Sequence, residues 1–110
     1  VSSDQVEDVI VGLQKAYPHK EIILTVGSQG SYYISGETVI HQEAYRVNAV
    51  DTTAAGDTFT GFYLASILRG ETVSNALSIA AKASSITVTK EGAAKSIPTL
   101  EQVLESMKNV

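Results

Sequence analysis

The fold depends most on one stretch of the sequence, NAVDTTAAGDTFTG, residues 48–61. Runs rich in β-branched and aromatic residues precede it, and longer segments with apolar residues at helical spacing follow it. The small and polar residues at its centre predict a turn, and a helix is expected to begin near Gly56. The stretch therefore predicts the junction between a β-rich first half and a helical second half.

The residues before this junction predict one helix and then strands. An apolar stripe at helical spacing runs through the first 17 residues, and Pro18 marks its end. The run EIILTV, residues 21–26, shows no alternation, as in a strand buried on both faces. Residues 31–35 and 37–41 flank Gly36 and predict a hairpin, and residues 44–47 predict a further strand. The stripe comprises Val6, Val9, Ile10, Leu13 and Tyr17, with Ser2 and Gln5 at capping-box spacing.

The residues after the junction predict three helices. The first spans residues 56–68 and is followed by Gly70, a natural C-terminal stop. The second is expected at about residues 73–89 and is rich in small side chains. The third follows Pro98, with Thr99 and Gln102 at capping-box spacing. In the first of these helices, one apolar face is expected to contain Phe59, Phe62, Tyr63 and Ile67. The order predicts an α/β fold, a sheet flanked by helices.

Composition excludes several classes of function. The 110 residues carry a net charge of −4 with scattered basic residues, which disfavours binding to nucleic acid or to an anionic membrane surface. There is no cysteine, so disulfides and thiolate catalysis are excluded. No apolar run approaches the length of a transmembrane span, and no signal peptide opens the chain. We therefore expect a cytoplasmic protein.

The junction is also the candidate site. Backbone N–H groups at the start of a helix are unpaired and attract anions, and Ala54, Ala55 and Gly56 leave room for a phosphate. Asp57 falls in the first helical turn. On this pattern alone, the structural alternative stays open: a carboxylate that only stabilises the helix, and small residues that only allow close packing. Neither a Walker P-loop nor a dinucleotide fingerprint is present.

The segment DTTAAGDTFTG resembles the signature D-T-x-[GA]-A-G-D-x-F-x-G of the ribokinase-like (PfkB) carbohydrate kinases. LTVGSQG (residues 24–30) and ITVTKEGAAKSIP (residues 86–98) resemble two further family segments in the same order, and the likeness covers about residues 9–104. The resemblance implies the C-terminal portion of a Rossmann-like sheet. It also implies ATP-dependent phosphorylation of a sugar hydroxyl, with ribose favoured because the motifs are closest to the ribokinase branch.

The resemblance assigns roles to individual positions. Asp57 matches the general base, and the backbone around Ala54, Ala55 and Gly56 matches the anion hole. The nucleotide-binding positions would be Thr25, Val26, Gly27, Ser28, Gln29, Gly30, Gly56, Asp57 and Ala81. The positions matching a monovalent-cation site, expected to hold K⁺, are Asp51, Thr53, Thr87, Lys90, Gly92 and Ser96. Mg²⁺ is expected on the ATP phosphates.

Three departures from the family qualify this interpretation. Ala81 stands where an Asn or His is common, with Lys82 beside it, and His19 and His41 match no family ligand. Family members are about three times longer. We therefore expect residues 1–110 to form a single C-terminal nucleotide-binding and catalytic portion without the sugar-binding part and lid. An exposed sheet edge in such a portion makes a homo-oligomer a hypothesis.

Two alternatives stay open from the sequence. One is another kinase of the family, acting on fructose, a keto-deoxy sugar acid or a nucleoside. The other is a non-catalytic nucleotide-binding module, favoured by the short length but disfavoured by the intact Asp57.

Overall fold

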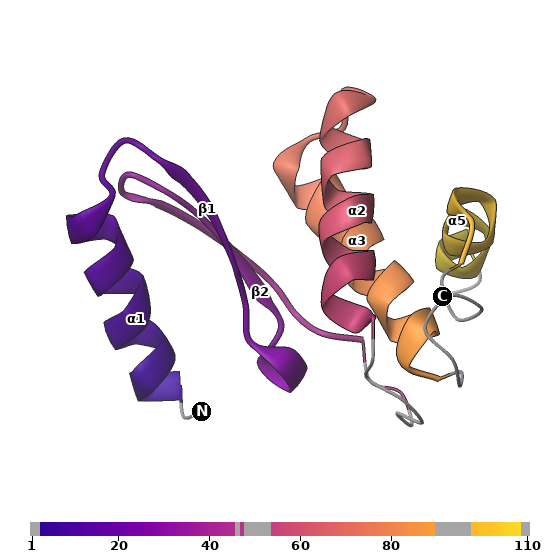
Figure 1. Cartoon of the computed structure of the whole chain (residues 1–110), viewed down its shortest axis with the longest axis horizontal. Coiled ribbons are helices and arrows are strands. Elements are labelled where there is room, and N and C mark those ends of the chain that lie inside the picture. The colour runs from indigo at the N-terminus through magenta and orange to yellow at the C-terminus, as the bar shows by residue number, and fades with distance from the viewer. Residues whose placement is uncertain (1–2, 46, 48–53, 90–97, 109–110) are drawn as a thin grey trace.

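A computed structural model describes residues 3–45, 47, 54–89 and 98–108. The described elements form successive layers, from α1 through a three-stranded sheet to the α2–α3 pair and then α5 (Figure 1). The order of helices and strands predicted from the sequence is confirmed. The elements are α1 (Ser3–Ala16), β1 (Glu21–Thr25), the 3-10 turn η1 (Gly27–Gln29), β2 (Ser31–Ser35), β3 (Thr38–Gln42), α2 (Ala55–Leu68), α3 (Val73–Val88) and α5 (Leu100–Lys108).

The sheet is an antiparallel meander in the order β1-β2-β3. Tyr33 pairs with Ile23 on one side and with Ile40 on the other. Gly36 takes a positive φ of 56° in the β2–β3 hairpin, a conformation that glycine adopts without steric cost. The further strand predicted at residues 44–47 is wrong for the described residues of that range, because the chain there leaves the sheet and runs toward α3.

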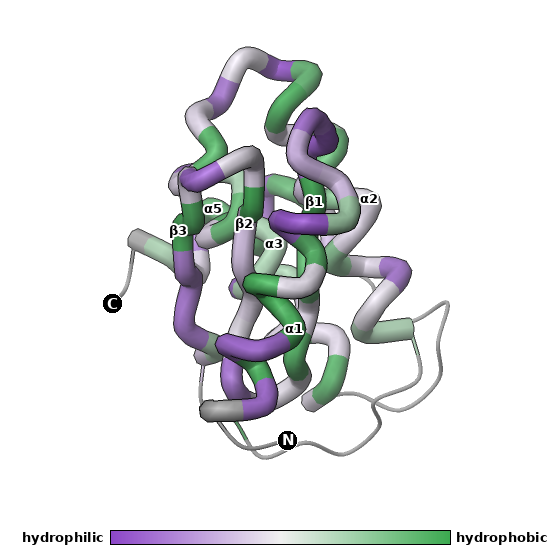
Figure 2. Tube along the Cα trace, turned by 90° about the vertical axis from the view of Figure 1, so that its left-hand side faces the viewer, coloured by the Kyte–Doolittle hydropathy of each residue, from purple (hydrophilic) through white to green (hydrophobic). Residues whose placement is uncertain are grey.

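Both faces of the sheet are covered, which explains the apolar run without alternation in β1. Ile22 and Leu24 pack toward α1, whereas Ile23 packs toward α2 and α3. Viewed from the α1 side, α1 lies in front of the sheet and α3 behind it (Figure 2). The central residues of β1 are only half-buried, since β1 is an edge strand of the described sheet.

The α2–α3 pair forms the main core against the sheet. Leu77 of α3 is fully buried, and burying a side chain of that size contributes about 1.5–3 kcal/mol. Phe59 and Tyr63 of α2 are buried as predicted. Ile67 lies at the edge of that face and is 36% exposed, whereas Ser66 is buried. On its far side α3 packs against α5 through Ile79 and Ala83, which contact Val103.

The helix ends follow the predicted signals. α2 ends in a Schellman motif, in which Gly70 N–H donates to Ile67 O (3.0 Å) and Glu71 N–H to Ser66 O (3.0 Å). Gly70 accordingly has a φ of 91°. α1 ends at Ala16, just before Pro18. Among the described residues, no helix has the length and apolar character that crossing a membrane requires.

Two buried tyrosines lie in the core between the sheet and α2. Tyr33 donates its hydroxyl proton to Glu21 Oε1 at 2.5 Å, and this hydrogen bond, helped by burial, raises the pKa of Tyr33. Burial also raises the pKa of Tyr63. Both phenols are therefore neutral near pH 7 and act as packing and hydrogen-bonding groups.

Candidate functional site

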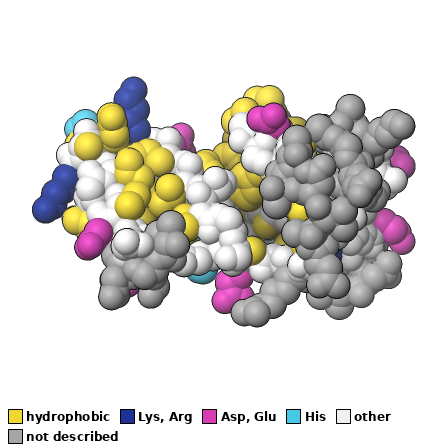
Figure 3. Space-filling view, turned by 60° about the horizontal axis from the view of Figure 1, so that its bottom comes forward, with side chains coloured by type: hydrophobic (Ala, Val, Ile, Leu, Met, Phe, Trp, Pro, Cys, Tyr) yellow, Lys and Arg dark blue, Asp and Glu magenta, His cyan; other side chains and the backbone are white. Residues whose placement is uncertain are grey.

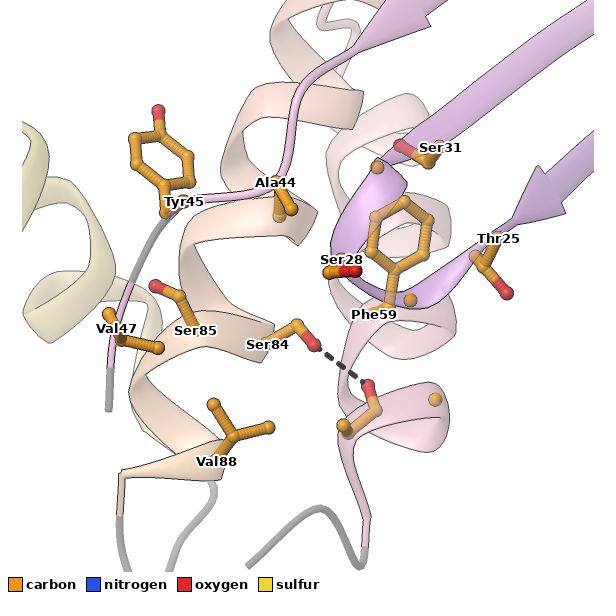
Figure 4. Close-up of a pocket in the computed structure, with 15 residues that line it drawn as sticks. Thr25, Ser28, Ser31, Ala44, Tyr45, Val47, Phe59, Ser84, Ser85 and Val88 are labelled. Atoms are coloured by element: carbon orange, nitrogen blue, oxygen red, sulfur yellow. Dashed lines mark hydrogen bonds between the residues drawn. The ribbon is translucent and has the colours of Figure 1, made fainter. Parts of the chain in front are cut away.

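A cleft of about 400 Å³ opens where the sheet meets the α2–α3 pair. In the space-filling view of this end of the molecule, hydrophobic side chains are visible in the hollow between the sheet and the helices (Figure 3). Its walls come from four segments that are distant in sequence (Figure 4). These segments are the turn after β1, the chain after β3, the first turns of α2 and the C-terminal half of α3.

The turn after β1 forms one wall of the cleft. It is closed by hydrogen bonds from Val26 N–H to Gly30 O (2.8 Å) and from Gln29 N–H to Val26 O (2.9 Å). Gly27 has a φ of 51° and Gly30 a φ of 94°, so both use conformations that other residues adopt only with strain. Small residues here let a ligand approach the backbone closely. Thr25, Gly27, Ser28 and Gly30 line the cleft.

The start of α2 forms a second wall, and its geometry is unusual. Ala54 precedes the helix in a left-handed conformation (φ 74°, ψ −1°) and is the only non-glycine residue of the described chain with positive φ. Alanine has no side-chain oxygen with which to cap the helix. Among the described residues, no side chain caps the start of α2, where the first N–H groups of a helix have no partner within the helix. Ala55 and Gly56 line the cleft.

Two hydroxyl contacts fix the start of α2 against the end of α3. Ser84 Oγ donates to Ala55 O at 3.2 Å, shown as the dashed line in Figure 4. Thr87 Oγ1 donates to Thr58 Oγ1 at 3.2 Å in a buried position. The first turn of α2 is thereby held in a defined position beside the cleft. Phe59, one turn further along, projects toward the turn after β1 and forms the floor.

The chain after β3 forms the rim of the cleft along α3. The Tyr45 hydroxyl lies 3.2 Å from Ser78 Oγ, and the Lys82 ammonium lies 4.7 Å from the centre of the Tyr45 ring. A cation over an aromatic face is attracted by the ring quadrupole. Lys82 is therefore engaged with Tyr45 and is half-buried.

The structure brings together many of the predicted nucleotide-binding residues. Six of the nine line one cleft, together with Ala55 of the predicted anion hole: Thr25, Gly27, Ser28, Gly30, Gly56 and Ala81. Val26 does not, because its side chain packs on the α1 side of the sheet. Gln29 and Ala54 adjoin the cleft without lining it. Asp57 is exposed in the first turn of α2, next to Gly56.

The predicted cation site is described only at Thr87, a buried residue of the last turn of α3. Asp51, Thr53, Lys90, Gly92 and Ser96 lie outside the described residues. Within the described residues, no group of His, Asp and Glu side chains is arranged to hold a metal ion.

Sequence reasoning missed three of the four residues that α3 contributes to the cleft. Ser84, Ser85 and Val88 line the cleft together with Ala81, at the helical spacing that places residues 81, 84, 85 and 88 on one face. That periodicity could have identified them once Ala81 was singled out. Tyr45 and Val47 carried no comparable signal, because no regular element brings them to the cleft.

The arrangement suits a ligand with two chemically different ends. Small and apolar side chains from α3 and Phe59 offer a surface for a flat apolar group. The uncapped start of α2 offers N–H donors and the positive end of a helix dipole to an anion.

Comparisons with known proteins agree with this geometry. Residues 1–100 match the family described as "pfkB family carbohydrate kinase". Ribokinase of Schizosaccharomyces pombe is 52% identical over 86 residues, which cover 76% of this chain and 27% of the relative. Ribokinase of Staphylococcus aureus is 46% identical over 85 residues, which cover 76% and 28% of the two chains.

A solved structure shares the fold. The structure of Arabidopsis thaliana ribokinase complexed with ribose and ATP aligns with a TM-score of 0.86 at 32% identity, covering 97% of this chain and 35% of that one. This chain therefore spans about a third or less of the length of these three relatives.

Proposed function

Because this chain belongs to the pfkB family of carbohydrate kinases, we propose that it supplies the nucleotide-binding and catalytic part of an ATP-dependent sugar kinase. The transferred phosphate would go to a primary hydroxyl of the sugar, and Asp57 would act as the general base. The names of the relatives that match at 46–52% identity favour ribose as the sugar and ribose 5-phosphate as the product.

The observation that carries this proposal is the uncapped start of α2 beside the cleft. A nucleotide has a flat base and an anionic phosphate chain, and the cleft offers an apolar wall on α3 and N–H donors at Ala55 and Gly56. Donors fixed in advance stabilise the charge that grows on a phosphoryl group during transfer. Ser84, through its bond to Ala55 O, holds these donors in place.

Asp57 would take the hydroxyl proton as the sugar oxygen attacks the γ-phosphorus. One O–P bond forms to the sugar, the bond from the γ-phosphorus to the bridging oxygen breaks, and ADP leaves with that electron pair. The carboxylate is exposed in the first turn of α2, adjacent to the N–H donors, so proton removal and charge stabilisation would occur at one place. General-base assistance of this kind is typically worth about 10²–10⁴-fold.

Both metal ions belong to the proposal. Mg²⁺ would be carried largely by the phosphates and water, as is usual for this ion. For K⁺, the last turn of α3 near Thr87 would offer backbone carbonyl oxygens, since the last carbonyls of a helix have no partner in a following turn. A monovalent cation at this helix end would also be favoured by the dipole.

Calorimetry of this chain with ADP and Mg²⁺, in K⁺ and in Na⁺, tests the nucleotide part. We expect binding that is tighter in K⁺. Absence of binding at millimolar ADP would remove the proposal that these residues form a nucleotide site by themselves. Binding without phosphoryl transfer to any sugar, in the protein that carries this chain, would favour a non-catalytic module.

The identity of the sugar needs a separate experiment. A deoxyribokinase of Salmonella typhi is 36% identical over 84 residues, so deoxyribose is a specific competitor of ribose. Comparing kcat/KM for ribose, deoxyribose and fructose in the protein that carries this chain separates these substrates. A preference for fructose or for a nucleoside would overturn the ribose assignment and keep the kinase.

Self-association and location complete the proposal. β1 has no strand partner on its outer edge among the described residues, and such an edge favours pairing with a second copy. Sedimentation equilibrium at several concentrations would test this, because a monomeric mass throughout would reject it. We keep the cytoplasm as the expected location, to be checked by cell fractionation.

A further inference from the structure

The turn Gly27–Gln29 is pressed tightly against the end of β3. A side-chain carbon added at Gly30 would lie 2.2 Å from Gln42 O and 3.1 Å from Ala44 N. These distances leave no space for a side chain at position 30, so only glycine fits there. The position of the turn is thus set by the strand beside it as well as by its own hydrogen bonds.

A side chain from β3 reaches back to this turn. His41 Nε2 lies 3.0 Å from Gln29 O. A carbonyl oxygen only accepts, so Nε2 must carry the proton and donate it. This contact joins β3 to the last residue of the turn whose neighbours, Ser28 and Gly30, line the cleft.

The His41 ring is itself held in place by a stack. Its centroid lies 4.4 Å from that of Tyr32, with 15° between the planes. Tyr32 is half-buried in the cluster between the sheet and α1, so the stack rests on a packed part of the fold. An exposed histidine is thereby fixed with its Nε2 aimed at the turn.

We propose that His41 is a positioning residue for the nucleotide cleft. It holds the Gly27–Gln29 turn at the distance from α2 and α3 that a bound nucleotide requires. This inference rests on the proposed function. His41 acts through Gln29 O and contacts no reacting atom, so it should affect nucleotide affinity and leave the proton-transfer step at Asp57 unchanged.

Two variants separate the two contacts of His41. His41→Phe keeps a flat ring on Tyr32 and removes the donor, whereas His41→Gln removes the ring and keeps an N–H donor at similar reach. Val39→Ala, two residues earlier on the same face of β3, is the matched control, because Val39 is exposed and pairs with Ile34, away from the turn.

The measurements are ADP affinity by calorimetry and amide hydrogen exchange of Gln29 and Gly30, whose N–H groups bond within the turn. We expect His41→Phe to weaken ADP binding about three- to tenfold, the usual worth of one hydrogen bond, and to speed exchange at both amides. His41→Gln should restore affinity to within about twofold, and Val39→Ala should change neither quantity.

The outcomes that contradict the two proposals differ. Unchanged exchange and unchanged ADP affinity in His41→Phe would overturn the role of His41 and leave the proposed function intact. Equal losses in His41→Phe and Val39→Ala would show a general effect on β3, which also overturns it. Absence of ADP binding to the unaltered chain would overturn the proposed function, whatever the exchange rates show.

Discussion

The helices α5 and α2 begin in opposite ways. At the start of α5, Thr99 Oγ1 accepts from Gln102 N–H (3.2 Å) and Gln102 Oε1 accepts from Thr99 N–H (2.9 Å), a complete capping box. At the start of α2, the residue before the helix is Ala54, which is left-handed and has no group with which to cap. One helix satisfies its first donors with its own capping box, whereas in the part of the chain that the structure describes the other has no such cap.

The difference shows that the start of α2 is less stable than it would be with an ordinary capping residue. A left-handed alanine costs of the order of 1 kcal/mol, and a missing cap costs about as much again. The start of α3, where Thr72 Oγ1 accepts from Asn75 N–H (3.1 Å), shows that this chain caps other helices in the ordinary way. Of these three helix starts, only that of α2 lines the cleft between the sheet and the α2–α3 pair, and this association favours a functional rather than a structural reason for the missing cap.

The largest effect should come from the acidic residue in the first turn of α2. We expect Asp57→Asn to lower kcat by at least about 10²-fold in the protein that carries this chain, because the amide cannot accept the sugar proton. ADP affinity should stay within a few fold, since the N–H donors are backbone groups. Steady-state kinetics and calorimetry together measure the two quantities.

Glu101 is the matched control for Asp57, because it is the acidic residue in the first turn of α5. Glu101→Gln should leave kcat unchanged, and any loss of stability should be a few tenths of a kcal/mol. Turnover of Asp57→Asn at the unaltered rate would remove Asp57 from the mechanism. Equal kinetic effects at both positions would remove the contrast between the two helices.

The sequence predicted the regular elements well, because each carries a local signal. The apolar stripe of α1, the hairpin at Gly36 and the capping box at Thr99 all depend on residues close together in the chain. The strand predicted at residues 44–47 failed because propensity does not tell where a β-rich chain leaves its sheet. Ile67 failed because the helical face is broad enough for its edge to stay exposed.

The second effect in size concerns the capped helix. Thr99→Ala removes the acceptor of Gln102 N–H and should lower the free energy of unfolding by about 1 kcal/mol. Urea denaturation measures this change. ADP affinity should be unaltered, since α5 packs on the side of α3 away from the cleft. A loss of ADP affinity in this variant would show that the two helix starts are not independent.

The third effect is a gain in folding stability together with a loss of ADP affinity, both from one substitution in α2. Gly56→Ala places a methyl group where no atom of the described residues lies within 4 Å, and alanine favours helix over glycine by roughly 0.5–1 kcal/mol. Unfolding should therefore become harder. ADP affinity should fall at least about threefold, because Gly56 lines the cleft where a phosphate would approach.

Gly61→Ala is the control for Gly56→Ala, because Gly61 also lies in α2 with open space around an added carbon but does not line the cleft. It should raise stability by a similar amount without changing ADP affinity. If both variants bind ADP as the unaltered chain does, the start of α2 is not where the phosphate binds.

The sequence could not reveal the geometry around the start of α2. The motif places small residues there, but it does not reveal that Ala54 adopts a left-handed conformation. The bond from Ser84 to Ala55 O joins residues 29 positions apart, and no local pattern predicts it. Long-range contacts of this kind decide whether a motif becomes a site.

The smallest effect should come from relieving the strain at Ala54. Ala54→Gly removes the steric cost of the left-handed conformation and adds flexibility to the unfolded chain, so we expect a net gain of about 0.5 kcal/mol. Ala55→Gly, one residue into the helix, should lose about 0.5–1 kcal/mol instead. Thermal and urea unfolding measure both. A loss of stability in Ala54→Gly as large as that in Ala55→Gly would mean that Ala54 stores no strain. The start of α2 would then carry no energetic cost at Ala54, and the conformation of this residue would not argue for a binding role.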